Sequence, residues 1–189
     1  GPKKPKTLVV TGRTQKKIDM AARLYTVEEA KKNGVKLVYV NTRDIADVNK
    51  ELRKYSEKGF DDVFIFAPNE EMVTYGVKML AFDGCLNFFS GPADQEFSSR
   101  VNFYNIHYNS THFVGTSGGN TEDMKQSIEL IENKTVNVAK IATHILGLDH
   151  AVETTKALPE LEGSKKIVYT HKKFPLTEVD KFDENSDDK

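Results

Sequence analysis

The stretch Gly84-Cys85-Leu86-Asn87-Phe88-Phe89-Ser90-Gly91-Pro92 decides the fold that we predict for this sequence. Its apolar run follows a glycine and stops at Ser90-Gly91-Pro92, which is typical of a short buried strand that ends in a sharp turn. The earlier stretch Val63 to Pro68 has the same plan and precedes a helical pattern. Strand, turn, helix and strand in succession indicate a parallel α/β sheet, in which ligands bind beyond the carboxyl ends of the strands. Ser90-Gly91-Pro92 is therefore expected to border a binding cleft.

The same order of elements recurs on both sides of this stretch. Apolar strand patterns are predicted at residues 7–11, 36–40, 63–67, 111–115 and 166–170. The segments between them show helical spacing and capping signals, including a helix that starts at Asp44 and another that is capped by Asp149. The predicted fold class is α/β, with a three-layer arrangement around a parallel sheet.

Composition sets bounds on the protein class. The chain has 189 residues, of which 38% are hydrophobic, and this length corresponds to about one domain. Its net charge of -1 predicts neither a nucleic acid nor an anionic membrane as partner. The single cysteine, Cys85, and the lack of a long apolar run favour a soluble, cytoplasmic protein. Residues 1–6 are expected to be a linker, 7–171 the folded domain and 172–189 a disordered acidic tail.

Small and polar residues follow the predicted strands and form the candidate site. Gly12-Arg13-Thr14 follows the first strand, where a glycine leaves room for a phosphate and an arginine offers a forked cationic partner. Small residues at later strand ends let a ligand approach the backbone. The alternative for each group is an ordinary surface residue or turn former. The remaining candidates are Asn41, Ala67, Pro68, Ser90, Gly91, Pro92, Thr116, Ser117 and Gly118.

No catalytic residue or metal ligand is assigned from the spacing of reactive side chains. The five histidines and Cys85 show no arrangement typical of zinc ligands. Cys85, His112 and His144 are interpreted as packing residues or backbone hydrogen-bond partners. The carboxylate pairs Asp61-Asp62 and Glu70-Glu71 are interpreted as caps and solvated turns.

Four runs of sequence together resemble a known family, the zinc-type medium-chain alcohol dehydrogenases. The likeness is closest to the branch of sugar-phosphate reductases that includes sorbose-1-phosphate reductase. A further segment, Thr143-His144 with Gly147-Leu148-Asp149, looks like the point where that family's chain leaves its cofactor domain. The four runs are Gly59 to Phe64, Asp83 to Pro92, Asn102 to Tyr108 and Val114 to Thr121.

This resemblance implies a Rossmann-type domain of an NAD(P)-dependent oxidoreductase that transfers hydride to a carbonyl, with a polyol or sugar phosphate as substrate. It implies that Gly12, Arg13 and Thr14 hold the adenosine end, and Arg13 then favours NADP over NAD. Ser90-Gly91-Pro92 and Thr116-Ser117 would border the nicotinamide. The family's zinc-bearing catalytic domain, first strand and glycine-rich turn have no counterpart here, so the chain is expected to be an incomplete, inactive fragment.

Two other functions stay open at this point. The chain could be a non-enzymatic nucleotide-binding or assembly fragment that pairs with another chain, or forms a homo-oligomer through sheet or helix edges. It could also be a different α/β transferase or methyltransferase whose ligand binds at the same strand ends.

Overall fold

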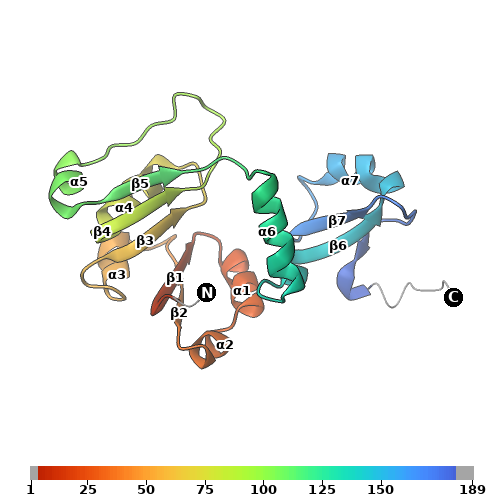
Figure 1. Cartoon of the computed structure of the whole chain (residues 1–189), viewed down its shortest axis with the longest axis horizontal. Coiled ribbons are helices and arrows are strands. Elements are labelled where there is room, and N and C mark those ends of the chain that lie inside the picture. Colours follow the sequence, from red (N-terminus) through yellow and green to blue (C-terminus); the bar gives the residue numbers. More distant parts are fainter. Residues whose placement is uncertain (1–3, 182–189) are drawn as a thin grey trace. The chain divides into compact units, whose positions relative to one another are not determined.

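The computed structural model of the chain describes residues 4–181, which fall into two compact units that meet in the sequence after Gly118 (Figure 1). Within these residues, no helix combines the length and the apolar character that a bilayer crossing requires.

The first unit contains two parallel sheets. One pairs β1 with β2, and the other has the order β3-β4-β5, with every pair parallel. The prediction of an α/β fold with parallel strands is therefore confirmed. The strands are β1 (Thr7–Gly12), β2 (Lys36–Asn41), β3 (Phe60–Ile65), β4 (Leu80–Phe88) and β5 (His112–Gly115), and the helices are α1 (Gln15–Leu24), α2 (Val27–Lys32), α3 (Val48–Arg53), α4 (Glu70–Met79) and α5 (Phe103–Asn109).

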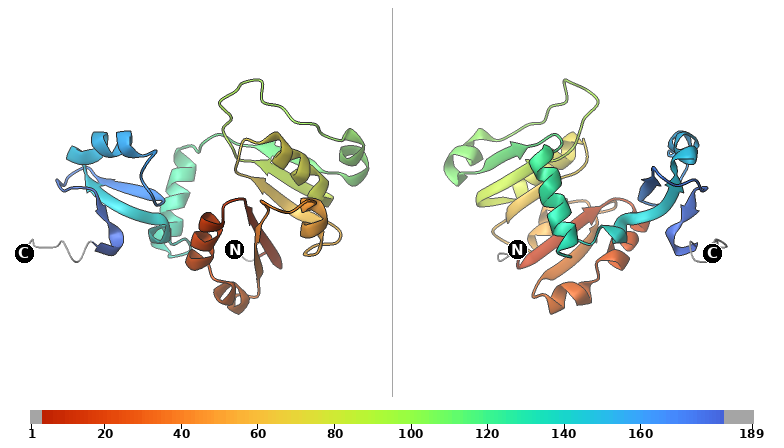
Figure 2. Two further views of the ribbon diagram at one scale, coloured as in Figure 1. Left: turned by 180° about the vertical axis from the view of Figure 1, so that it is seen from behind. Right: turned by 45° about the vertical axis from the view of Figure 1, so that its right-hand side comes forward.

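Two apolar clusters hold this unit together. Helices α1 and α2 pack against the β1-β2 sheet, and α4 packs against β3 and β4 (Figure 2). The first cluster joins α4 to the sheet through Ile65, Val73 and Leu86. In the second cluster, Val9 of β1 and Val63 of β3 pack against the same buried residues, which are Val40, Leu52 and Met79. The cores beneath the two sheets are therefore continuous.

The two sheets are nevertheless not paired with each other. Among residues 4–181, β1 pairs only with β2, and β3 pairs only with β4. Each of the strands β1 and β3 thus has one edge whose backbone groups bond to no neighbouring strand in this part of the chain.

Several local predictions differ from the structure. Helix α3 begins after Asp47, not Asp44, because the Asp47 carboxylate accepts the Lys50 backbone N–H at 2.9 Å and caps the helix. Asp61 and Asp62 do not lie in a turn but are exposed residues of β3. Helical spacing predicts that Met72, Tyr75, Gly76 and Met79 face the sheet from α4. In the structure Met72 and Tyr75 are half-exposed, and the buried residues of this helix are Val73, Gly76, Val77 and Met79.

The second unit is built around β6, which pairs parallel with β7 and antiparallel with β8. Leu146 of β6 is fully buried. Asp149 does not cap α7, because it lies within a preceding 3-10 turn and His150 takes the N-cap position. Strand β8 falls in the segment predicted to be a disordered tail, of which residues 182–189 lie outside the described residues. The elements are α6 (Thr121–Glu132), η1 (Val138–Ile141), β6 (Ala142–Gly147), η2 (Leu148–His150), α7 (Ala151–Ala157), β7 (Lys165–Tyr169), β8 (Thr177–Glu178) and η3 (Val179–Lys181).

Candidate functional site

The carboxyl ends of β3, β4 and β5 come together at one end of their sheet. The register places Ile65 beside Phe88, and Phe88 beside Gly115. The Phe89 N–H donates to the Ile65 carbonyl at 2.9 Å, which extends the pairing by one residue. The structure therefore brings three predicted groups to the same sheet end: Ala67-Pro68, Ser90-Gly91-Pro92 and Thr116-Ser117-Gly118.

The predicted residues Gly12 and Asn41 are neighbours at the carboxyl end of the β1-β2 sheet. The Asn41 side chain is already engaged, because its amide donates to the Gln15 side chain at 2.8 Å and its oxygen accepts the Arg43 N–H at 3.0 Å. Gly12 lies close to α1, and a Cβ added there would meet Ile18 at 3.2 Å. A glycine at this position lets the strand end approach the start of the helix closely.

Arg13 and Thr14 connect this strand end to α1, and both are exposed. Thr14 is the N-cap residue, and its carbonyl accepts the Lys17 and Ile18 N–H groups at 3.1 and 3.2 Å. The Thr14 side chain forms no capping hydrogen bond. An arginine beside a helix start without a side-chain cap gives a local surface that favours an anion.

The other strand ends offer open backbone. A Cβ added at Gly91 or Gly118 would meet no atom within 4 Å, and Gly118 has a φ of +70. Asn69 fixes the loop after Ala67-Pro68, because its side chain accepts the Met72 N–H at 2.9 Å and caps α4. Small residues on fixed turns leave the backbone at these strand ends accessible to a ligand.

Two features of this sheet were not predicted from the sequence. The Asn87 side-chain oxygen is buried and has no hydrogen-bond partner. The sequence offers one signal for this, because Asn87 is a polar residue within an apolar run. Phe64, Phe66 and Phe89, here called the phenylalanine face, form an exposed aromatic group. The rings of Phe64 and Phe66 lie 6.2 Å apart, and those of Phe66 and Phe89 lie 6.1 Å apart. Strand alternation places them opposite the residues that pack against α4.

The reactive side chains form no metal site in the described residues. Between residues 4 and 181, no group of three or more His, Cys, Asp or Glu side chains could hold an ion. His112 does not pack as predicted; it is exposed and its Nε2 lies 2.9 Å from Asp83 Oδ1. His144 Nδ1 lies 3.0 Å from the Thr143 hydroxyl. The described residues therefore do not fit a zinc ion.

Comparison of the sequence with known proteins gives consistent matches. Residues 7–133 match the family described as zinc-binding dehydrogenase. The chain is 48% identical over 177 residues to L-sorbose 1-phosphate reductase of Klebsiella pneumoniae, covering 94% of the chain and 42% of that protein. It is 42% identical over 183 residues to mannitol-1-phosphate 5-dehydrogenase of Aliivibrio fischeri, covering 96% of the chain and 43% of that protein. The chain thus spans less than half the length of these relatives.

Solved structures share the fold at low sequence identity. 2R,3R-butanediol dehydrogenase of Bacillus subtilis matches with a TM-score of 0.69 at 14% identity, over 87% of this chain and 44% of that one. A zinc-binding dehydrogenase of Sinorhizobium meliloti bound to NADP matches with a TM-score of 0.63 at 15% identity, over 87% and 45%. An alcohol dehydrogenase of E. coli in complex with NADH matches with a TM-score of 0.59 at 13% identity, over 86% and 44%.

Proposed function

The chain belongs to the zinc-binding dehydrogenase family, and we propose that it is the cofactor-binding part of an NAD(P)-dependent oxidoreductase of the medium-chain alcohol dehydrogenase type. The observation that supports this most directly is the register of β3, β4 and β5, which aligns three small-residue strand ends at one end of a parallel sheet. Dinucleotides bind at that end in doubly wound sheets. The relatives' names point to a polyol or sugar phosphate as substrate. Because the chain spans less than half of these relatives, we propose this activity for the whole protein and expect little turnover from the chain alone.

Each group of the candidate site has a proposed role. Gly12, Arg13 and Thr14 hold the adenosine end of the cofactor, with Asn41 supporting that strand end. Ala67-Pro68, Ser90-Gly91-Pro92 and Thr116-Ser117-Gly118 border the remainder, with the nicotinamide nearest the last two groups. When bound, the reduced cofactor would supply hydride to a carbonyl carbon, and the oxidised cofactor would accept hydride from the carbinol carbon of an alcohol. This chain contributes binding and orientation, and the zinc of the family is proposed to lie on a catalytic domain outside these residues.

The proposal is tested through Arg13. Removal of one charge-assisted contact to the 2'-phosphate costs about 1.5–3 kcal/mol, or about 10- to 100-fold in affinity. We therefore expect Arg13→Ala to weaken NADP binding by that factor in the whole protein and to leave NAD binding nearly unchanged, measured by calorimetric titration. Arg23→Ala, an exposed arginine in the last turn of α1, is the matched control and should change neither affinity. The role of Arg13 at the 2'-phosphate would be contradicted if the parent bound NAD more tightly than NADP. It would also be contradicted if Arg13→Ala and Arg23→Ala bound NADP equally well.

A second function is favoured by one specific observation, the unpaired edges of β1 and β3. Val9 of β1 and Val63 of β3 pack on the same buried cluster, so one further parallel strand would complete the pairing over a core that already exists. We propose as the alternative that the chain is a non-enzymatic assembly module that takes this strand from another polypeptide. Native mass spectrometry separates the two functions. A complex that forms stably while NADP and NAD fail to bind favours the module, whereas dinucleotide binding in that complex favours the enzyme.

A further inference from the structure

A long loop follows the strand end Ser90-Gly91-Pro92 and joins β4 to α5. Residues 89–102, here called the anchored loop, contain no helix or strand. The loop returns along the sheet, because α5 precedes β5, which starts at the opposite end of the sheet from Ser90-Gly91-Pro92 (Figure 1). Loops longer than about 12 residues without secondary structure are uncommon in compact domains and usually have a function.

The first contact that holds the anchored loop is apolar. The rings of Phe97 and Phe88 lie 5.7 Å apart, with 20° between their planes. Phe97 and Val101 also pack against the first apolar cluster, the one that joins α4 to the sheet. The Phe97 N–H donates to the Asp94 carbonyl at 3.3 Å. A turn therefore brings Phe97 back onto the sheet shortly after Ser90-Gly91-Pro92.

The second contact is made by the hydroxyl group of Ser99, a half-buried residue. Its Oγ donates to the Glu70 carbonyl at 3.1 Å. Because a serine has one hydroxyl hydrogen, the Thr74 hydroxyl, 3.0 Å away, is then the donor to Ser99. Glu70 is the first residue of α4, which starts just after Ala67-Pro68. Ser99 therefore connects the loop that begins with one candidate strand end to the helix that begins after another.

The anchored loop stays open between the strand end and these two contacts. Residues 91–96 are exposed, and a Cβ added at Gly91 would meet no atom within 4 Å. The contacts of Phe97 and Ser99 thus hold the loop without filling the space beside Ser90-Gly91-Pro92.

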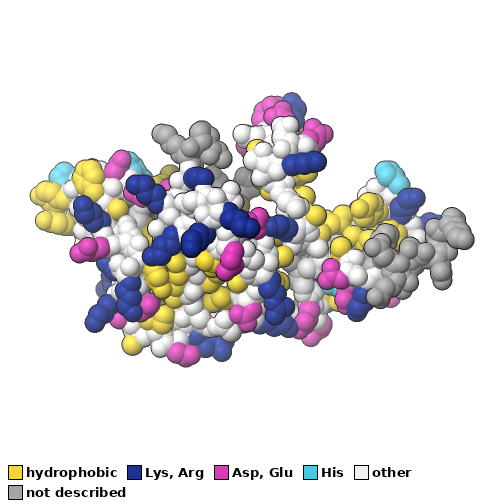
Figure 3. Space-filling view, turned by 90° about the horizontal axis from the view of Figure 1, so that it is seen from below, with side chains coloured by type: hydrophobic (Ala, Val, Ile, Leu, Met, Phe, Trp, Pro, Cys, Tyr) yellow, Lys and Arg dark blue, Asp and Glu magenta, His cyan; other side chains and the backbone are white. Residues whose placement is uncertain are grey.

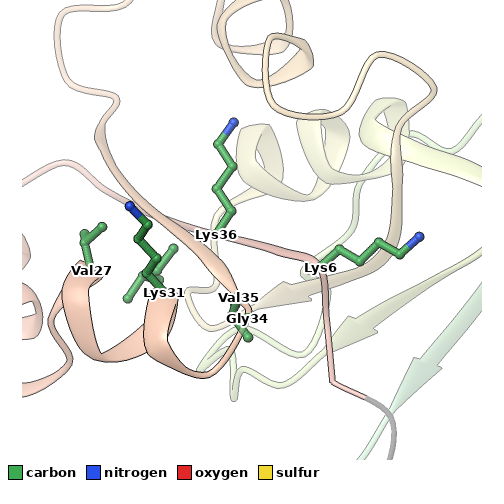
Figure 4. Close-up of a pocket in the computed structure, with 7 residues that line it drawn as sticks. Lys6, Val27, Lys31, Gly34, Val35 and Lys36 are labelled. Atoms are coloured by element: carbon green, nitrogen blue, oxygen red, sulfur yellow. The ribbon is translucent and has the colours of Figure 1, made fainter.

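Other charged surface regions show a contrast with this loop. In Figure 3, Lys and Arg side chains are spread among exposed hydrophobic atoms. A hollow of about 350 Å³ at the amino ends of β1 and β2 is lined in part by Lys6, Lys31 and Lys36, whose side chains point in different directions (Figure 4). Such diverging charges define no site, whereas Phe97 and Ser99 both act on one loop at a candidate strand end.

We propose that Phe97 and Ser99 are positioning residues for the nicotinamide half of the cofactor, an inference that rests on the proposed function. They hold Ser90-Gly91-Pro92 in place relative to Ala67-Pro68, and they act through that strand end, not by contact with the cofactor. A loop that is already held in its binding conformation loses less conformational freedom when the ligand binds, so the affinity is higher. Binding of the adenosine end at Gly12-Arg13-Thr14, on the other sheet, does not depend on these contacts.

The test compares the dinucleotide with a fragment that has the same adenosine end but no nicotinamide. The whole protein is titrated calorimetrically with NADP and 2',5'-ADP, or with NAD and ADP if it prefers NAD. Ser99→Ala should weaken dinucleotide binding about 3- to 10-fold, the effect of one lost hydrogen bond, and leave fragment binding unchanged. Ser99→Thr retains the hydroxyl group and should restore the affinity. Ser127→Ala removes a hydroxyl that bonds within α6 to the Asp123 carbonyl, and this matched control should bind both ligands as the parent does.

The apolar contact is tested with two variants of Phe97, and circular dichroism establishes that each is folded. Phe97→Ala should weaken the dinucleotide at least as much as Ser99→Ala does, and Phe97→Leu, which keeps most of the apolar volume, should weaken it less. The positioning role is overturned if Ser99→Ala and Phe97→Ala bind the dinucleotide as the parent does, or if they lose affinity for the fragment by the same factor. Failure of the proposed function is distinguishable, because the parent itself then binds no dinucleotide, and that result overturns both proposals.

Discussion

At the residue scale, Gly59 is a position where a single added methyl group should strongly destabilise the fold. Its φ is +99, and a Cβ added there would lie 2.7 Å from the Ala81 nitrogen and 2.8 Å from the Leu80 carbonyl. Backbone atoms cannot move aside as a flexible side chain can, so both strain and overlap result. We expect Gly59→Ala to lower the free energy of unfolding by about 2 kcal/mol or more, measured by urea denaturation. Gly91→Ala, which meets no atom within 4 Å, should be nearly neutral, and an equal loss there would contradict this argument.

Tyr39 gives a prediction for the dependence of stability on pH. Its hydroxyl donates to the Tyr25 carbonyl at 2.8 Å and the Ala21 carbonyl at 3.1 Å, and the pKa of Tyr39 is raised by burial and, to a smaller extent, by Tyr25. A raised pKa in the folded state favours the neutral phenol. The associated stability is therefore fully present below pH about 10 and is lost as the pH rises through the higher folded pKa.

Comparison with Tyr39→Phe measures this effect directly. Below pH about 10 the variant should be less stable by about 0.5–1.5 kcal/mol, the contribution of a typical hydrogen bond, and the difference should shrink at higher pH. Urea denaturation of both proteins over this pH range gives the difference. Tyr108→Phe, at an exposed position, is the control and should have little effect on stability. If the difference in stability between the parent and Tyr39→Phe grew with pH, the predicted loss of this stabilisation at high pH would be wrong.

At the scale of elements, the N-terminus of α6 depends on a reciprocal capping box. The Asn120 side chain accepts the N–H groups of Glu122 and Asp123 at 2.8 and 3.1 Å, and the Asp123 carboxylate accepts the Asn120 N–H at 2.8 Å. We expect Asn120→Ala to destabilise the helix by about 1 kcal/mol and to speed amide hydrogen exchange in its first turn. Ser127→Ala is the control, because its hydroxyl bonds within the helix to the Asp123 carbonyl and alanine favours helices. Equal acceleration of amide hydrogen exchange in Asn120→Ala and Ser127→Ala would contradict the role of the capping box.

Most elements could be predicted from the sequence because their signals are local. The apolar runs at Val63 and Leu86 and the cap at Asn69 depend on residues a few positions apart, and the structure has a strand or a helix start at each. The errors arose where two local signals compete. Asp44 and Asp47 can both cap a helix, and the hydrogen bond from Lys50 decides for Asp47. Helix α4 runs directly into β4 without a turn residue, so the strand's first residues were not recognised.

The candidate site was predictable only as a set of strand ends. Gly12, Ser90 and Thr116 follow apolar runs, and the parallel arrangement then requires neighbouring ends to share one side of a sheet. Contacts between distant residues were not predictable, because they depend on the packing of whole elements. Examples are the bond from Asn41 to Gln15 and the exposed pairing of His112 with Asp83.

At the scale of the whole molecule, the described surface exposes several large aromatic side chains. Phe66 and Phe82 are each 71% exposed, and Phe103 is 76% exposed. Exposed apolar groups matter most when they are contiguous, because only then can a partner cover them together. The phenylalanine face is contiguous, with successive ring centres 6.2 and 6.1 Å apart. The local sequence pattern does not predict this surface, since each phenylalanine lies within or beside a predicted buried strand.

We therefore expect the chain to self-associate through the phenylalanine face as its concentration rises. Burial of one phenylalanine contributes about 1.5–3 kcal/mol, so the double variant Phe66→Ser and Phe89→Ser should weaken association at least about tenfold in sedimentation velocity experiments. The double variant Phe82→Ser and Phe103→Ser removes two rings of similar or greater exposure and is the matched control. If association depended only on total exposed apolar area, the control would weaken it at least as much. A larger effect of the Phe66 and Phe89 changes would instead locate the contact on this face of the β3-β4 sheet, whereas a chain that stays monomeric at every concentration would refute the prediction.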